Sequence, residues 1–298
     1  MQLPRITIVI PFRLDKDNKP NDILSKHELA FVKTVDGLFE KANNTIEVIV
    51  ALDGFWPETL PVDNPNLHYI HWGEAGGMRR GINAAADIAK GEYLMKTDAH
   101  CLFAPGFDDA LIEASQPNWV QIPRRYSLDA EKWEKYKYPR DYMYLSWPDN
   151  PKDWGGAGFH GREWRERDKD PELQKIDLDD TMSFQGSCWF MPLEYFNRLG
   201  LMDVANYGPF WQEAQDIGLK CLFDGGRIIR NKRTWYAHLH KGRQYGRGFF
   251  IAKDSLQMPV EYTKKLVKHS LDKFIPIIES QWPLPGWPED WKERLIDV

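Results

Sequence analysis

The sequence has few cysteines, no long hydrophobic run and no excess of basic residues. Its three cysteines, Cys101, Cys188 and Cys221, are far apart and lack metal-type spacing, so the sequence indicates neither a disulfide framework nor a cysteine-based metal site. An odd and sparse cysteine count fits a reducing compartment. The formal net charge of −5 argues against broad electrostatic binding to nucleic acid, although a local basic patch stays compatible with it.

The patterns of membrane and secreted proteins are missing too. No window approaches the length and apolarity of a membrane span, and residues 1–5 lack the basic start and apolar stretch of a signal peptide. We therefore expect a cytoplasmic protein with no membrane association.

Two common nucleotide-binding motifs are also absent. No Gly-Lys-Ser/Thr phosphate loop occurs, and no Gly-x-Gly-x-x-Gly follows the first predicted strand, so the usual ATP and dinucleotide sites lose support. A nucleotidyltransferase would normally show a glycine-rich, basic loop after that strand, and the segment Phe12-Arg13-Leu14-Asp15 is not one.

The first hundred residues, in contrast, show clear periodicity. Apolar runs at 6–10, 46–52, 67–72 and 93–97 predict strands, and helical spacing at about 22–42 and 77–90 predicts two helices. This order predicts an α/β fold with a mixed, mostly parallel sheet flanked by helices. Asp53 and Asp98 follow predicted strands, at the carboxyl edge where such folds bind ligands.

The tripeptide Asp98-Ala99-His100 ends the fourth predicted strand. Residues i and i+2 of extended chain point the same way, so the Asp98 carboxylate and the His100 imidazole could both reach one metal ion. An ion there would neutralise a diphosphate, which makes the tripeptide a candidate for sugar-nucleotide chemistry. The alternative is an aspartate at a turn beside a histidine that is satisfied by ordinary hydrogen bonds.

The rest of the chain is less regular and rich in aromatic residues, with 13 Trp, 12 Tyr and 15 Phe in the whole sequence. From residue 124 to about 180 we expect long loops and short helices over the open edge of the sheet, either an acceptor platform or a solvated insertion. We expect one amphipathic helix in the tail, at about 261–274. The sequence leaves open whether this tail packs on the core or helps to form an oligomer.

Three blocks of residues carry a resemblance to a known family. They are the strand Ile6–Pro11 with Asp53, the segment from Gly77 and Arg80 to Asp98-Ala99-His100-Cys101, and Gln185–Phe190 with Trp211–Lys220. Together they resemble glycosyltransferases of the GT-A fold, closest to family 2 enzymes and the related polypeptide N-acetylgalactosaminyltransferases. The ending Asp-x-His-Cys is similar to that of the latter group, whereas most family 2 enzymes have Asp-x-Asp.

The likeness covers roughly residues 5–245, in the order of the family. It implies a GT-A glycosyltransferase domain at residues 1–250 with an aromatic-rich, acceptor-side insertion at 124–180. A helical tail rich in proline and tryptophan would follow at 251–298.

The resemblance implies a site for a UDP-sugar. Its nucleotide-sugar-binding residues would be Pro11, Arg13, Asp53, Gly77, Arg80, Asp98, Trp189, Trp211, Lys241 and Arg243. Structural explanations stay open for several of them: Asp53 could form an Asp-Gly turn, Arg80 could lie on a helix surface, and the two tryptophans could pack in the core. Lys241 and Arg243 would either close over a diphosphate or form a basic surface loop or nucleic-acid contact.

The metal ligands implied by the resemblance are Asp98, His100 and one histidine far downstream. Both His238 and His240 qualify, and we favour His238 because Ala237-His238 better matches the pattern of a small residue before the histidine. Two imidazoles and one carboxylate suit Mn²⁺ better than Mg²⁺, so the expected cofactor is Mn²⁺ with Mg²⁺ as the alternative.

Glu213 and Asp216 lie in the acidic helix of the third block and are the candidate catalytic residues. In inverting family 2 enzymes an aspartate next to the glutamate is the general base, and here that neighbour is Ala214. The resemblance therefore favours retention of the anomeric configuration, with the leaving diphosphate as proton acceptor. Asp216 could still be a base in an altered register.

The expected protein is thus a metal-dependent glycosyltransferase that moves a hexose or N-acetylhexosamine from a UDP-sugar to a hydroxyl acceptor. The alternatives are an inverting family 2 enzyme of polysaccharide synthesis and a non-catalytic GT-A domain that binds nucleotide or glycan. The acceptor stays open between a glycan, a protein hydroxyl, a lipid carrier and a modified nucleobase in DNA. The oligomeric state stays open as well.

Overall fold

The computed structural model describes residues 3–17, 19–152, 156–240, 246, 248–249 and 256–296. Its strands are β1 Ile6–Phe12, β2 Ile46–Asp53, β3 Leu67–Trp72, β4 Tyr93–Thr97, β5 Cys101–Phe103, β6 Trp119–Asp129, β7 Glu134–Arg140, β8 Met143–Leu145, β9 Gly161–Glu163, β10 Leu178–Asp180, β11 Cys188–Pro192 and β12 Arg227–His238. Its helices are α1 Asn21–Lys41, α2 Met78–Ile88, α3 Phe107–Glu113, α4 Arg165–Asp168, the 3₁₀ helix η1 Leu173–Lys175, α5 Leu193–Arg198, α6 Val204–Tyr207, α7 Glu213–Phe223, α9 Gln257–Lys268, α10 Leu271–Ser280 and α11 Trp291–Leu295.

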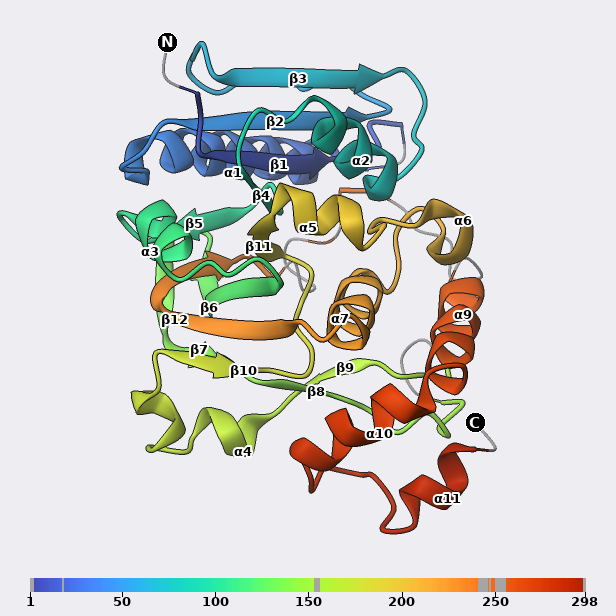
Figure 1. Cartoon of the computed structure of the whole chain (residues 1–298). Coiled ribbons are helices and arrows are strands. Elements are labelled where there is room, and N and C mark those ends of the chain that lie inside the picture. The colour runs from blue at the N-terminus through green and yellow to red at the C-terminus, as the bar shows by residue number, and fades with distance from the viewer. Residues whose placement is uncertain are drawn as a thin grey trace.

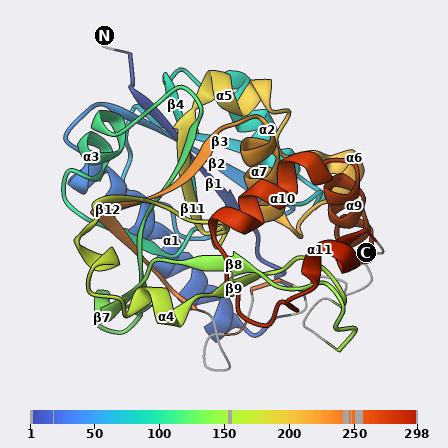
Figure 2. The same ribbon diagram turned by 60° about the horizontal axis from the view of Figure 1, so that its bottom comes forward.

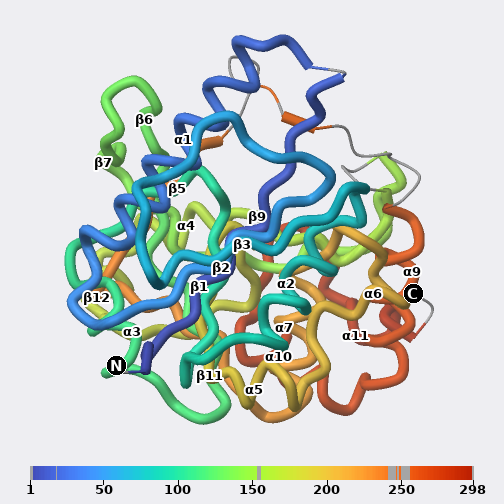
Figure 3. The backbone as a smooth tube through the Cα atoms, turned by 90° about the horizontal axis from the view of Figure 1, so that it is seen from above, coloured from blue at the N-terminus to red at the C-terminus, as the bar shows by residue number. Residues whose placement is uncertain are grey.

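The amino-terminal half of the main sheet is parallel. β1 pairs with β2 on one side and with β4 on the other, and β2 pairs with β3, all in parallel. The apolar run of β1 is buried on both faces, because Ile8 packs in one core with Phe31 of α1 while Val9 packs in another with Ile82 of α2. α1 and α2 therefore cover opposite faces (Figures 1 and 3), and the expected α/β fold is confirmed.

The sheet continues into a second half with mixed pairing. The strand order is β10-β12-β6-β11-β4-β1-β2-β3, with β5 beside β12 and β7 beside β6. β11 runs antiparallel to β4 and joins the two halves, whereas β12 runs parallel to β6. β8 and β9 form a separate hairpin. The carboxyl end of β4, which leads into Asp98, therefore opens at the junction of the two halves.

The expectation of loops and short helices across residues 124–180 was wrong for much of that stretch. β6 continues to Asp129 and is followed by β7, β8, β9 and β10, while the short helices among the described residues of this stretch are α4 and η1. β6 and β10 both pair with β12, which lies far downstream, so these hydrogen bonds are not local, although β6 also pairs with its neighbour β7. β8, β9 and β10 have three residues each, too few for an alternating pattern to be recognised.

The carboxy-terminal tail contains more helix than the sequence indicated. The single helix expected at 261–274 was wrong, because α9 ends at Lys268 and α10 begins at Leu271. Ser270 leaves the helical conformation, with φ −134° and ψ 34°, and its carbonyl accepts hydrogen bonds from the amides of Lys273 and Phe274, which start the new helix. In the described part of the chain, no helix has the length and apolarity needed to cross a membrane.

The tail packs on the core of the protein, which answers one question that the sequence left open. A shared apolar cluster joins residues from the 142–182 stretch with residues from the tail; its members include Tyr142, Leu145, Trp147, Phe159, Trp164, Met182, Phe274, Ile278, Leu284, Trp287, Trp291 and Leu295. The Trp287 indole also donates a hydrogen bond to the Leu145 carbonyl at 2.7 Å. Figure 2 shows α10 and α11 beside the β8–β9 hairpin.

We expect the Phe274→Ala substitution to lower the free energy of unfolding by about 3–5 kcal/mol, because it removes a fully buried ring that packs on Phe159 and Trp287. Urea denaturation followed by tryptophan fluorescence measures this change. The matched control is Tyr138→Ala, whose side chain is 74% exposed and whose loss is expected to change stability by less than about 0.5 kcal/mol. Equal effects of the two substitutions would contradict the shared core.

Candidate active site

A large cavity opens at the carboxyl ends of β1, β2 and β4. Its volume is about 1340 Å³, above the usual range of about 300–1,000 Å³ for a small-molecule site. Residues from distant parts of the chain line it: Pro11 of β1, Asp98 after β4, Arg162 of β9, Glu213 of α7 and Leu256 before α9. The cavity therefore lies where the parallel half, the 124–180 stretch and the tail meet, and it has room for two ligands.

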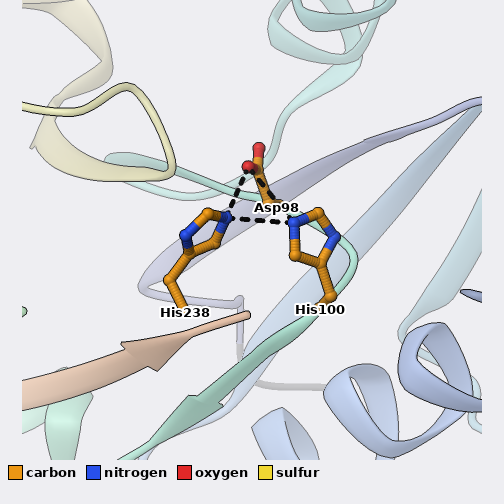
Figure 4. A group of neighbouring side chains, drawn as sticks. All are labelled: Asp98, His100 and His238. Atoms are coloured by element: carbon orange, nitrogen blue, oxygen red, sulfur yellow. Dashed lines mark hydrogen bonds and ion pairs between the residues drawn. The ribbon is translucent and has the colours of Figure 1, made fainter. Parts of the chain in front are cut away.

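Asp98, His100 and His238 converge on one point at this cavity (Figure 4). Asp98 follows β4, His100 precedes β5, and His238 is the last residue of β12. β5 and β12 pair antiparallel with His238 opposite Cys101, and this register brings the two histidines side by side. The His100 Nε2 atom lies 3.0 Å from His238 Nε2, and the Asp98 Oδ2 atom lies 3.2 Å from His238 Nε2 and 3.7 Å from His100 Nε2.

This donor set fits a divalent metal ion. Metal–ligand bonds of about 2.1 Å at right angles put neighbouring ligand atoms about 3 Å apart, close to the three distances observed. Burial alone would raise the pKa of the Asp98 carboxyl, but the Lys96 ammonium and the two imidazoles outweigh it and hold this pKa well below its ordinary value. An ionised carboxylate and two imidazole nitrogens are thus presented to one point.

His240, the alternative third ligand, points to a different partner. Its Nε2 atom lies 3.0 Å from Arg125 Nη1, and because a guanidinium can only donate, this nitrogen is the acceptor. Burial, with the nearby charges of His238 and Arg125, lowers the pKa of His240 to about 4. The structure therefore groups His238, and not His240, with Asp98 and His100.

Lys96 is a site residue that the sequence analysis missed. It lies on β4, is 2% exposed and lines the cavity. Its ammonium donates to Asp98 Oδ1 at 2.7 Å and to the Gly186 carbonyl at 2.5 Å, and lies 3.4 Å from Glu213 Oε2. Burial would lower its pKa, but the carboxylates of Asp98 and Glu213 raise it above its ordinary value. The sequence did contain an indication of Lys96, because alternate residues of an extended chain share one face and residues 96, 98 and 100 follow that spacing.

Glu213, one of the two candidate catalytic residues, lines the cavity as the first residue of α7. The Trp189 indole donates to its Oε1 atom at 2.8 Å, and Lys96 lies beside its Oε2 atom. Burial raises the pKa of this carboxyl against the opposing charge of Lys96. A Cβ on Gly186 would lie 2.3 Å from Glu213 Oε2, so the position of the carboxylate depends on a residue without a side chain at 186.

Asp216, the other candidate catalytic residue, does not line the cavity. It is fully buried, with Lys220 Nζ 2.7 Å from Oδ1 and Arg79 Nε 3.7 Å from Oδ2. Burial raises the pKa of its carboxyl against the opposing charge of Lys220. Arg79 also donates to the Trp211 carbonyl at 2.7 Å, so this buried ion pair fixes the loop before α7. Asp216 thus lies in a buried structural ion pair outside the cavity lining, and its catalytic role stays a prediction.

The nucleotide-side residues divide into two groups. Pro11, Arg13, Asp53 and Gly77 line the cavity, whereas Arg80 does not. Asp53 accepts hydrogen bonds from the Gly76 amide at 2.7 Å, the Gly77 amide at 2.9 Å and the Arg80 guanidinium at 3.1 Å. It therefore holds the turn before α2. Arg80 also stacks on Trp72, with its guanidinium 4.5 Å from the ring centroid.

Of the two tryptophans predicted to bind the donor sugar, only Trp211 lines the cavity. Trp189 is fully buried, stacks on Phe196 and supports Glu213 from behind. Lys241 and Arg243 fall outside the described residues, so the basic loop that they were predicted to form stays a prediction.

The fold and this site define an α/β protein with a cavity at the carboxyl edge of its sheet and a three-residue group suited to a metal ion. Residues 27–200, more than half of the chain, match Glycosyl transferase family 2. The chain belongs to this family.

One solved structure shows the same GT-A fold over nearly the whole chain: GalNAc-T7 with UDP, GalNAc and Mn²⁺. It is 16% identical, with a TM-score of 0.61, and the match covers 99% of this chain and 54% of the other. The chain thus spans about half the length of that protein. A search of curated proteins finds no match.

We expect Lys96→Met to lower the free energy of unfolding by about 3–5 kcal/mol, because it leaves the Asp98 and Glu213 carboxylates without their shared cation in a buried site. Urea denaturation at pH 7.5 with EDTA measures this change without a contribution from bound metal.

Two further variants separate charge from packing. Lys175→Met removes a lysine from an exposed ion pair with Glu172 and is expected to change stability by less than about 1 kcal/mol. Adding Glu213→Gln to Lys96→Met removes one of the stranded charges and should recover part of the loss. If the double variant were no more stable than Lys96→Met, the charge argument would be wrong.

Proposed function

We propose that this protein is a metal-dependent, retaining glycosyltransferase that moves a hexose or N-acetylhexosamine from a UDP-sugar to a hydroxyl acceptor. The observation that carries the proposal is the convergence of Asp98, His100 and His238 on one point of a cavity at the carboxyl edge of the sheet. Membership of glycosyl transferase family 2 supports it, and so does the fold shared with a protein crystallised with UDP, GalNAc and Mn²⁺.

Asp98, His100 and His238 would hold the metal ion, and Mn²⁺ suits two imidazoles and one carboxylate best. When bound, the ion would supply positive charge to the diphosphate of the donor. The uridine would lie on the β1–β2 side, against Pro11, Arg13 and Gly77, with Asp53 shaping the turn beneath it. Lys241 and Arg243 are proposed to contact the diphosphate from the loop after β12.

Glu213 is proposed to accept a hydrogen bond from a hydroxyl of the donor sugar or the acceptor. The Lys96 ammonium and the Trp189 indole hold its carboxylate by hydrogen bonds, so the group is positioned before any ligand binds. Trp211 would pack against a sugar ring from the same wall.

Retention of the anomeric configuration is supported by the hydrogen bonds and ion pairs of the carboxylates that line the cavity. Inversion needs a base that takes the acceptor's proton as its oxygen attacks. In the described part of the chain, every carboxylate that lines the cavity already has a strong donor: Asp53 has two backbone amides, Asp98 and Glu213 share Lys96, and Glu163 pairs with arginines. We therefore assign the proton to the leaving diphosphate.

The donor site is tested by calorimetric titration of UDP, with Mn²⁺ and with EDTA. We expect EDTA to weaken UDP binding at least about tenfold, and we expect Asp98→Ala and His238→Ala to cause a similar loss in the presence of Mn²⁺. The reason is that each variant removes one of three ligand atoms at a single point.

Two histidine variants are the controls for that titration. His269→Ala changes an exposed histidine at the end of α9, and His240→Ala changes the histidine that bonds to Arg125. Both should keep the metal dependence. If EDTA did not change UDP binding, the cavity would still be a nucleotide site, but the proposed metal-dependent chemistry would be wrong. If the folded protein did not bind UDP at all, a UDP-sugar could not be its donor.

The stereochemistry can be tested before the acceptor is known, because glycosyltransferases can transfer the sugar to water. We expect slow hydrolysis of a UDP-α-sugar chosen from UDP-glucose, UDP-galactose and their N-acetylamino counterparts. One-dimensional proton NMR should detect the α-anomer first, before mutarotation mixes the anomers. A first-formed β-anomer would show inversion and would require a base at this site.

A further inference from the structure

Three arginines converge on one carboxylate at the wall of the cavity formed by β6, β7, β9 and α4. The Glu163 carboxylate lies 3.2 Å from Arg125 Nη2, accepts a hydrogen bond from Arg140 Nη1 and lies 3.9 Å from Arg165 Nε. We call Arg125, Arg140, Arg165 and Glu163 the arginine cluster. Arg125, Glu163 and Arg165 line the same cavity as the candidate metal ligands.

The arginine cluster has an excess of positive charge. Guanidinium groups stay protonated in proteins, so three arginines against one carboxylate leave two charges uncompensated within the cluster. This excess of positive charge is most costly at Arg125, because its side chain is only 2% exposed and water cannot solvate the charge. Its other partners, the Gln185 side chain and the His240 Nε2 atom, are neutral acceptors, and its buried Nε atom has no hydrogen-bond partner in the described part of the chain.

Arg125 shares the Glu163 carboxylate with two other arginines, and a buried cation that is only partly balanced by an anion is costly, here at the wall of a cavity. An anionic ligand would therefore stabilise these guanidinium groups. Guanidinium groups bind phosphate and carboxylate through paired N–H donors, and a phosphate group brings enough charge to balance an excess of two.

The arginine cluster lies on the side of the metal group that faces away from β1 and β2. Arg125 contacts His240, and the His240 ring packs 5.0 Å from the ring of His238. The donor residues Pro11 and Asp53 belong to the opposite half of the sheet. A cavity of about 1340 Å³ leaves room beside a nucleotide sugar for a second ligand at this wall.

We propose that the arginine cluster binds a phosphate group carried by the acceptor, so that the acceptor of this glycosyltransferase is a phosphorylated compound with a free hydroxyl. The inference rests on the proposed function, because it assigns the acceptor half of the same cavity. It also predicts a phosphate site that stays open when the donor site is filled.

The experiment is a calorimetric titration of inorganic phosphate into protein saturated with UDP and Mn²⁺, at low ionic strength. Wild-type protein is compared with Arg140→Gln/Arg165→Gln, which removes the two more exposed arginines of the cluster and leaves buried Arg125 in place. The matched control is Arg198→Gln/Arg227→Gln, which removes the same charge from two arginines that each pair with one exposed carboxylate elsewhere. UDP affinity is measured for all three proteins in the presence of Mn²⁺.

We expect wild-type and control proteins to bind phosphate alike, and the cluster variant to bind it at least about tenfold more weakly with UDP affinity unchanged. Three results would overturn the inference. They are no phosphate binding to the UDP-loaded wild type, equal phosphate binding by the cluster variant and the control, and a fall in UDP affinity in the cluster variant, which would assign the arginines to the donor diphosphate. Failure of the wild type to bind UDP would overturn the proposed function instead, and the phosphate titration of the free protein would still report on the cluster.

Discussion

The buried ammonium of Lys96 is the interaction on which the site depends. It joins Asp98, the carboxylate of the candidate metal group, to Glu213 at the start of α7, and it ties both to the Gly186 carbonyl. A lysine that is 2% exposed is stable in this position only because two carboxylates surround it. Lys96 donates a hydrogen bond to Asp98 Oδ1, so the other carboxylate oxygen, Oδ2, is the one that faces the two histidines. One cation therefore sets the orientation of the groups on both sides of it.

The local sequence was sufficient for the part of the site that lies between β4 and β5. Asp98 and His100 were found because an extended chain places alternate residues on one face, and the structure groups both with His238. The same rule points to Lys96, yet lysine is usually a surface residue, and the sequence does not show that β11 covers this end of β4. The sequence favoured His238 over His240 through the small residue before it, and the structure groups His238 with the other two ligands, whereas the contact of His240 with Arg125, more than a hundred residues earlier, could not be seen in the sequence.

The fold, too, was predictable where the signal lies in the local sequence, which is in the first hundred residues. Apolar, β-branched runs identified β1 and β2, since parallel strands buried on both faces carry their own signal, and shorter strand-like segments indicated β3 and β4. β6, β11 and β12 pair with one another or with β4 across long separations, so their register is a property of the assembled sheet. The abundance of tryptophan was visible in the sequence, but that Trp189 supports Glu213 and Trp287 binds the Leu145 carbonyl follows from tertiary packing.

The position of the third ligand, His238, shows how strictly the metal group depends on this long-range pairing. β12 and β5 are antiparallel with His238 opposite Cys101, and the Leu239 amide donates to the His100 carbonyl just beyond the strand. Because side chains alternate along a strand, a slip of one residue would turn His238 to the opposite face and present Ala237 or Leu239 in its place. The sheet fixes this register by burying Tyr236 and Ala237, both fully inaccessible, against its two faces. The packing of an apolar strand thus sets the geometry of a polar site.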